Sequence, residues 1–345
     1  ADPWSRGPST VGYMTDLLSY ESGLGEAPRE LRVALWYPAI EGSGSGNARY
    51  PLFVPDQAEQ DALPDIETIA ALLIYSHGAK VWPEMGSFMA EYFASHGWVV
   101  AAMTHTGDSL ASVSSDRPDE MYVWRSLDVS ATLNYLENLE GSHPLSGRAN
   151  TTRAMLSGHS FGGYTTLLSA GASFDMNYLR DVHCQERGGT LCESLNGPLG
   201  ERMEAGLRDS RIVAAIPQSA GNYKFIRQGA TQIEVPTLLI TATRDQANTE
   251  EGSNRPFWEA LIAPESTQRE SHRRLSFLEA GHATFTVACQ HLPTLEQDDG
   301  CGPDFTPIRE AQTLMLAYSL FFGRAYVLGD EAAILNITQG VGENL

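Results

Sequence analysis

A cluster of glycines surrounds one serine in RAMLSGHSFGGYTT (153–166). A short apolar run comes before the cluster, and residues 161–171 have the pattern of a helix. Glycine destabilises the interior of a strand or helix by about 0.5–1 kcal/mol relative to alanine, so several glycines together indicate a turn too tight for side chains. The spacing G-x-S-x-G between a strand and a helix is typical of a turn that lifts the serine hydroxyl clear of a sheet. The sequence therefore predicts Ser160 as a nucleophile.

Apolar, strand-like runs alternate with helical patterns along much of the chain. This alternation predicts an α/β fold in which a mostly parallel sheet is covered by helices on both faces. We expect one domain over residues 1–345, interrupted by a polar insertion at 172–210 that would form a cap or a loop near the substrate entrance. Strands are predicted at 31–38, 71–79, 98–107, 153–158, 211–218, 236–243 and 274–280, and helices at 87–97, 118–140, 161–171 and 308–325.

A serine nucleophile needs a base, and the base needs an acid that orients it. In sheets of this kind, ligands collect at the carboxyl ends of the strands, and the acid and the base follow the serine in that order. PTLLITATRD places Asp245 just after a predicted strand, and RLSFLEAGHATF places His282 just after the next one. The sequence therefore predicts Asp245 as the acid and His282 as the base.

Other side chains compete for these two roles. His159 adjoins the serine within the turn and cannot easily face its hydroxyl, and His272 precedes its strand instead of following it. His291 lies further along, in loop-like sequence, and Glu279 is a reserve candidate for the acid.

A second motif follows the predicted strand at 71–79, where the chain reads Ser-His-Gly-Ala. In this fold a loop after an early strand supplies one of two backbone N–H groups that stabilise an oxyanion. We expect these donors to be the amides of Ala79 and Phe161. Trp82 is a candidate for the wall of the acyl pocket, with a place in the core as the alternative, and His77 and His105 are interpreted as structural residues.

The composition excludes several classes of partner. The formal net charge is −20 and lysine occurs only at positions 80 and 224, which argues against binding to nucleic acids and to anionic membranes. No apolar run approaches the roughly 20 residues that a membrane helix needs. The acidic stretch at 296–304 lacks the spacing of an EF-hand, and it is more typical of a solvated loop than of a calcium site.

The four cysteines form two close pairs, Cys184 with Cys192 and Cys289 with Cys301. Two local disulfides are the simplest interpretation, although four cysteines allow three connectivities. Metal binding is the weaker alternative because neither pair has C-x-x-C spacing. Disulfides favour an oxidising compartment, so we expect a secreted or periplasmic protein.

Two stretches carry a resemblance to a known family. The run LLIYSHGAKVWPEMGSFMAEYFASHGWVVAAMTHTGDS (72–109) and the later GHSFGGYTT (158–166) resemble the platelet-activating-factor acetylhydrolase family, whose bacterial relatives are often described as predicted dienelactone hydrolases. VGYMTDLL and LRVALWYPA are similar to the N-terminal strands of that family, and the likeness spans roughly residues 10–170 and 211–285.

The resemblance implies an α/β-hydrolase fold, a Ser160–Asp245–His282 triad and ester hydrolysis without a metal or organic cofactor. Dienelactone hydrolases themselves use a cysteine nucleophile, whereas this chain has Ser160. Polyester hydrolases of the cutinase type share the fold and a similar G-H-S-x-G-G turn. Short-chain esters, polyesters and acetylated lipids are therefore all expected substrate classes, small or polymeric.

Two other functions remain open at this stage. A cofactor-free perhydrolase or haloperoxidase-like activity would use the same triad, and a non-catalytic binding protein would keep the fold alone. The sequence leaves the oligomeric state undetermined.

Overall fold

The computed structural model describes residues 1–25, 27–55, 57–112, 116–294 and 297–338. In these residues the strands form one sheet with the order β3-β1-β2-β5-β4-β6-β7-β8-β9. The strands are β1 (Thr10–Tyr20), β2 (Arg29–Ala39), β3 (Ala58–Gln60), β4 (Ala70–Ser76), β5 (Val99–Met103), β6 (Ala149–His159), β7 (Ile212–Gln218), β8 (Leu238–Ala242) and β9 (Arg273–Phe277). From β5 to β9 all neighbours are parallel, while β2 is antiparallel to both β1 and β5. The predicted mostly parallel sheet is confirmed.

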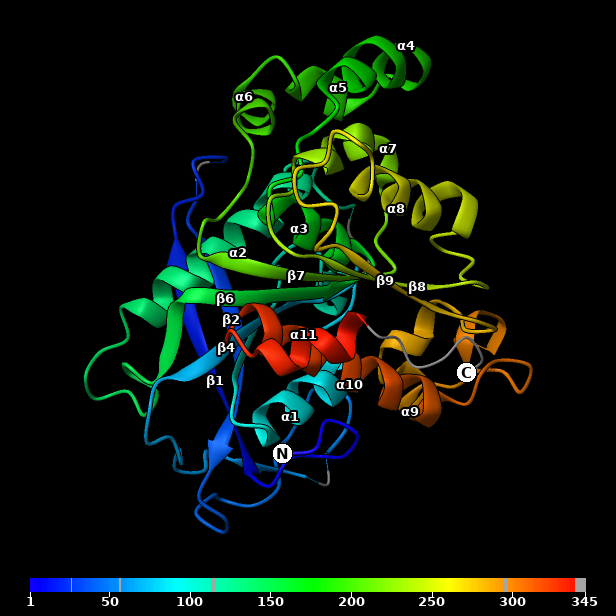
Figure 1. Ribbon diagram of the computed structural model, residues 1–345. Helices are drawn as coiled ribbons and strands as arrows, with labels where there is room; N and C mark the ends of the chain where they lie inside the picture. Colours follow the sequence, from blue (N-terminus) through cyan, green and yellow to red (C-terminus); the bar gives the residue numbers. More distant parts are fainter. Residues whose placement is uncertain (26, 56, 113–115, 295–296, 339–345) are drawn as a thin grey trace.

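Helices cover both faces of this sheet (Figure 1). α1, α10 and α11 lie on one face, and α2, α3, α7 and α8 lie on the other. The helices are α1 (Ser87–Ser95), α2 (Met121–Glu137), α3 (Phe161–Ser169), α4 (Cys184–Arg187), α5 (Thr190–Ser194), α6 (Pro198–Ala205), α7 (Tyr223–Ile226), α8 (Arg255–Leu261), α9 (Ala288–His291), α10 (Ile308–Tyr326) and α11 (Glu331–Thr338).

The apolar clusters on the two faces of the sheet follow from the alternation of side chains along the strands. In β4, Leu73 and Tyr75 pack into the core beneath α1 and α10, whereas Leu72 and Ile74 pack into the core beneath α2. Burial of one such side chain contributes roughly 1.5–3 kcal/mol, so a strand with apolar residues on both faces is stable only between two helical layers.

Strand β2 does not end at Pro38, where its predicted range stops, but reaches Ala39. It continues through Pro38, which faces Val11 of β1. Because β5 pairs only with Val33–Trp36 of β2, the missing N–H of Pro38 falls outside that ladder.

The 172–210 segment lies between α3 and β7 and contains α4, α5 and α6. Its buried leucines join the cluster that includes Phe161, Tyr164 and Phe225, on the face covered by α2 and α3. Disulfides join Cys184 to Cys192 in this segment and Cys289 to Cys301 near the end of the sheet, which are the two pairs that the sequence predicts. No helix in the described ranges has the length and apolar character of a membrane span.

Candidate active site

Ser160 lies in the turn between β6 and α3, at the carboxyl end of its strand. Its φ of +57° and ψ of −115° are a backbone conformation that residues with side chains rarely adopt. A Cβ at Gly158 would lie 2.5 Å from the carbonyl oxygen of Gly162, and one at Gly162 would lie 1.9 Å from the carbonyl oxygen of Ser76. The glycines are therefore required because backbone segments approach each other too closely for any side chain.

Asp245 and His282 follow β8 and β9, and their side chains meet at the same edge of the sheet. The Nδ1 of His282 lies 2.9 Å from Oδ2 of Asp245, whose side chain is buried. The backbone N–H of Asn248 donates to the other carboxylate oxygen at 2.7 Å. Because a carboxylate accepts, the His282 proton lies on Nδ1, and Nε2 is the ring nitrogen that can accept a proton.

Ser160 and His282 line one cavity of about 170 Å³. Gly78 and Ala79 of the loop after β4 line the same cavity, and a Cβ at Gly78 would lie 3.6 Å from Cβ of Ser160. The loop predicted to supply an oxyanion donor thus lies against the predicted nucleophile. The amides of Ala79 and Phe161 donate no hydrogen bond to any group in the described part of the chain.

Of the competing candidates, His159 is the one that contacts His282. Its Nε2 donates to the backbone oxygen of His282 at 3.0 Å, and the two ring centres are 4.4 Å apart. Burial, and then the proximity of the His282 ring, lower the pKa of His159 well below its usual value. His159 is therefore a neutral donor that supports the His282 backbone.

The remaining candidates lie elsewhere. His272 is buried before β9, where burial and the neighbouring Arg273 lower its pKa to about 4. His291 stacks on Phe53 with ring centres 3.7 Å apart. Glu279 is exposed and pairs with Arg244 at 3.2 Å.

Asp299 is a positioning residue that the sequence analysis did not find. Its Oδ1 accepts from the backbone N–H of His282 at 2.8 Å and from that of Gln246 at 3.1 Å. One carboxylate thus joins the two loops that carry His282 and Asp245, and the Cys289–Cys301 disulfide closes the same segment. The sequence predicts a solvated loop at 296–304, of which Glu296 lies outside the described residues. The pairing of Cys301 with Cys289, which is close to His282 in the sequence, is the signal that places this loop near the site.

His77 controls the orientation of the peptide between Gly78 and Ala79. The backbone N–H of His105 donates to Nε2 of His77 at 3.0 Å, so the His77 proton lies on Nδ1, which donates to the carbonyl oxygen of Gly78 at 2.6 Å. Burial, and then the charge on Arg125, lower the pKa of His77 well below its usual value, so the ring stays neutral. In a trans peptide the N–H points opposite to the carbonyl oxygen. The His77 hydrogen bond therefore turns the Ala79 N–H away from the His77 ring.

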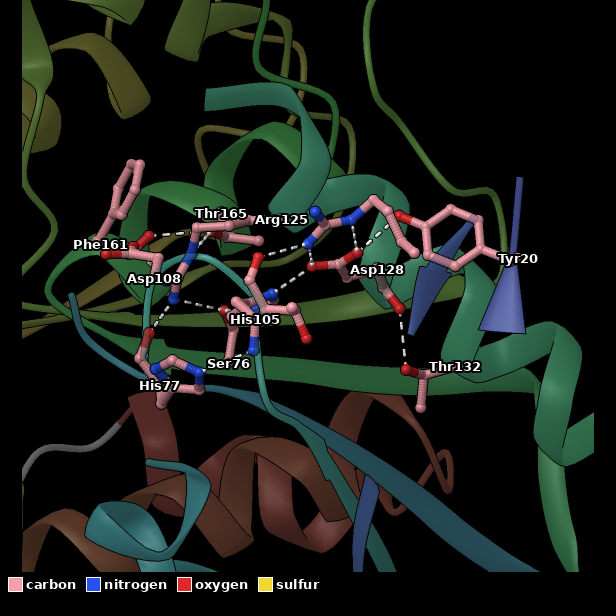
Figure 2. A network of polar contacts seen from close by, with 12 residues as sticks. Tyr20, Ser76, His77, His105, Asp108, Arg125, Asp128, Thr132, Phe161 and Thr165 are labelled. Carbon is pink, nitrogen blue, oxygen red and sulfur yellow. Dashed lines mark hydrogen bonds and ion pairs between the residues drawn. The ribbon is translucent and has the colours of Figure 1, made fainter. Parts of the chain in front are cut away.

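Arg125 of α2 joins the loop after β4 to helix α3 (Figure 2). Its guanidinium donates to the backbone oxygen of His77 and to Oγ1 of Thr165 at 3.2 Å, and it lies 4.7 Å from the ring centre of Phe161. Asp108 balances its charge at 2.8 Å. Although burial lowers the pKa of Arg125 to about 10, the side chain stays charged at neutral pH. Both segments that carry the predicted oxyanion donors are thus held by one cation.

A buried serine–histidine–aspartate network adjoins this loop (Figure 2). Oγ of Ser76 is 2.8 Å from Nε2 of His105, whose Nδ1 is 2.8 Å from Oδ2 of Asp128. All three side chains are 0% exposed, so no substrate reaches Ser76. Burial, and then the charge on Arg125, lower the pKa of His105 to about 3. Burial opposes ionisation of Asp128, but hydrogen bonds from His105 and Arg29 lower its pKa below the usual value. This buried network is a structural support, which is the role predicted for His105.

Two features that were expected at the Ser160 cavity lie elsewhere. Trp82 does not line the cavity with Ser160 but a neighbouring apolar one. No residue of the 172–210 segment lines the Ser160 cavity, because its leucines pack over α2 and α3. A larger hollow of about 660 Å³ between β1 and α2 lies away from Ser160 and His282. Within the described residues no group of three or more His, Cys, Asp or Glu side chains could hold a metal ion.

Comparison with known proteins supports the architecture. No protein-family model and no curated protein sequence matches this chain. Among solved structures, a ferulic acid esterase from Streptomyces cinnamoneus aligns with a TM-score of 0.64 and 20% sequence identity, over 97% of this chain and 95% of that one. The fold is that of the α/β-hydrolases. At this identity the likeness establishes the fold, and the chemistry has to be argued from the site.

Proposed function

We propose that this protein is a serine carboxylic-ester hydrolase that acts through an acyl-enzyme on short-chain esters. The observation that carries the proposal is the 2.9 Å contact between His282 and Asp245, at a cavity that His282 shares with the strained Ser160. The ferulic acid esterase with a similar fold agrees with ester chemistry.

In the proposed mechanism, Oγ of Ser160 attacks the ester carbonyl carbon while Nε2 of His282 takes the hydroxyl proton. Asp245 keeps the imidazole in the required tautomer and stabilises the imidazolium, without itself taking the proton. The amides of Ala79 and Phe161 stabilise the oxyanion of the tetrahedral intermediate. The C–O bond to the alcohol then breaks, and His282 gives its proton to the leaving oxygen. Water hydrolyses the acyl-enzyme by the same route.

The finer assignments are proposals as well. The resemblance of 72–109 and 158–166 supports membership of the platelet-activating-factor acetylhydrolase-like group. The two disulfides favour a secreted or periplasmic location because such bonds persist in oxidising compartments. Polyesters and acetylated lipids are the further substrate classes, and the 172–210 segment is an insertion in a single domain.

Hydrolysis of p-nitrophenyl acetate, butyrate, octanoate and palmitate, together with fluorophosphonate labelling, tests the proposed function. We expect the label on Ser160 and the highest kcat/KM for the acetate or butyrate, because the cavity of about 170 Å³ is small. An unlabelled Ser160 and no hydrolysis would instead support a non-catalytic binding protein. Peracid formation from acetate and hydrogen peroxide, without ester hydrolysis, would support the perhydrolase alternative.

The orientation of the Gly78–Ala79 peptide gives a prediction for His77. A His77→Gln variant keeps an acceptor near the Nε2 position but loses the donor to the Gly78 oxygen, whereas His77→Asn keeps a donor near the Nδ1 position. Because loss of one oxyanion donor typically lowers kcat by about 10²–10³-fold, we expect a fall of that order for His77→Gln, with little change in KM. We expect His77→Asn to recover a large part of the rate.

The measurements are kcat and KM for p-nitrophenyl acetate and the thermal unfolding midpoint of both variants. If kcat follows the unfolding midpoint in both, or if KM rises while kcat is unchanged, His77 does not act through the oxyanion donor.

A further inference from the structure

A second cavity adjoins the one that contains Ser160. The two cavities share Val81, Met85 and Ala288, which form the border between them. Met85 is nearly buried, and a methionine side chain is unbranched and adapts its shape easily. A substrate group attached to a carbonyl at Ser160 is therefore within reach of the second cavity.

The residues that line this second cavity are all of hydrophobic type. Beyond the three shared residues it is lined by Leu52, Trp82, Leu110 and Leu292. These residues come from the loop after β2, the segment before α1, the short helical turn η2 (Leu110–Ser112) and the chain after α9. The Ser160 cavity, in contrast, includes the side chains of His159, Ser160 and His282. Transfer of an uncharged apolar group from water into this cavity is therefore favourable.

The size of the cavity narrows the choice of group. Its volume is about 150 Å³, and an apolar protein cavity of about that volume binds benzene. The indole of Trp82 adds an aromatic surface against which a ring packs in an offset or edge-on arrangement. The net charge of −20 disfavours an anionic group in the same place.

We propose that the cavity between Trp82, Leu110 and Leu292 is a substrate subsite for a benzene-sized, uncharged apolar group of the ester. The subsite rests on the proposed ester hydrolysis at Ser160 and specifies its substrate class. A phenyl ring fits this description on either side of the ester, in the alcohol or in the acyl group. Substrates that carry the ring on one side only distinguish these two cases.

The test compares kcat/KM for three esters: ethyl acetate, benzyl acetate with the ring on the alcohol side, and ethyl phenylacetate with the ring on the acyl side. We expect one of the two aromatic esters to be preferred over ethyl acetate by about tenfold or more, since one methylene in an apolar pocket is already worth about tenfold. The preferred ester shows which side of the substrate the subsite binds.

A Leu110→Trp variant fills the cavity and is expected to lower that preference by about tenfold or more. Leu292→Trp fills it from the α9 side and repeats the test if the first variant does not fold. The matched control is Leu328→Trp, because Leu328 is exposed and lies away from the cavity. The backbone oxygen of the nearby Tyr326 accepts a hydrogen bond from Arg153, which lies in the amino-terminal half of β6, whereas Ser160 follows the carboxyl end of that strand. The control should keep the wild-type preference.

The ratio of two kcat/KM values does not depend on how much of the enzyme is folded, so it separates specificity from stability. The subsite is wrong if neither aromatic ester is preferred, or if both filling variants keep the wild-type ratio. If the wild type hydrolysed none of the esters and Ser160 were not labelled by the fluorophosphonate, the proposed function itself would be wrong.

Discussion

Replacing Ser160 by alanine is expected to lower kcat for p-nitrophenyl acetate by about 10⁵-fold or more. Without Oγ no acyl-enzyme forms, and only the amides of Ala79 and Phe161 remain to stabilise direct attack by water. The φ of +57° at position 160 strains alanine and serine alike, so the fold should change little. Steady-state p-nitrophenolate release at high enzyme concentration, with the unfolding midpoint measured in parallel, checks this expectation.

The matched control is Ser169→Ala. Ser169 lies at the end of α3, the helix that begins after Ser160, and its buried Oγ has no hydrogen-bond partner within the described residues. We expect this variant to keep the wild-type kcat, because the Ser169 hydroxyl makes no hydrogen bond in the described part of the chain. Substantial activity in Ser160→Ala would show that another group is the nucleophile, and most of the proposed function would fail with it.

Replacing Asp245 by asparagine is expected to lower kcat by about 10⁴-fold, equivalent to about 5 kcal/mol of transition-state stabilisation. An amide N–H facing Nδ1 of His282 moves the imidazole proton to Nε2, where it prevents proton transfer from Ser160. The amide oxygen can still accept from the N–H of Asn248, which contacts the carboxylate at 2.7 Å. The variant should therefore fold, and kcat for p-nitrophenyl acetate measures the loss.

Glu279→Gln is the corresponding control because Glu279 follows β9 and is the other carboxylate considered for this role. Its exposed side chain pairs with Arg244. Exposed ion pairs contribute about 1 kcal/mol or less, so a small change in stability and an unchanged kcat are expected. If Glu279→Gln lost the activity while Asp245→Asn kept it, the assignment of the acid would be reversed.

Local patterns in the sequence were sufficient to predict the fold class. Apolar runs on both faces of β4 to β8 require two helical layers, and the runs are visible in the sequence. The turn at Ser160 was predicted because steric exclusion of a Cβ at Gly158 and Gly162 leaves a direct mark in the sequence. The contact between Asp245 and His282 could be predicted because each residue lies in the loop after a strand, and the carboxyl ends of parallel strands share one edge of the sheet.

The features that could be predicted from the sequence are therefore those that depend on neighbouring residues or on the alternation of strands and helices. Three contacts become visible only in the folded protein: Asp299 holds the backbone of His282, Arg125 joins the loop of His77 to helix α3, and the 172–210 segment packs over α2 and α3. The same holds for Trp82, which faces the second cavity. These contacts join side chains to backbone or to elements that are distant in the sequence. The direction in which each side chain points depends on tertiary packing, so local sequence patterns do not predict it.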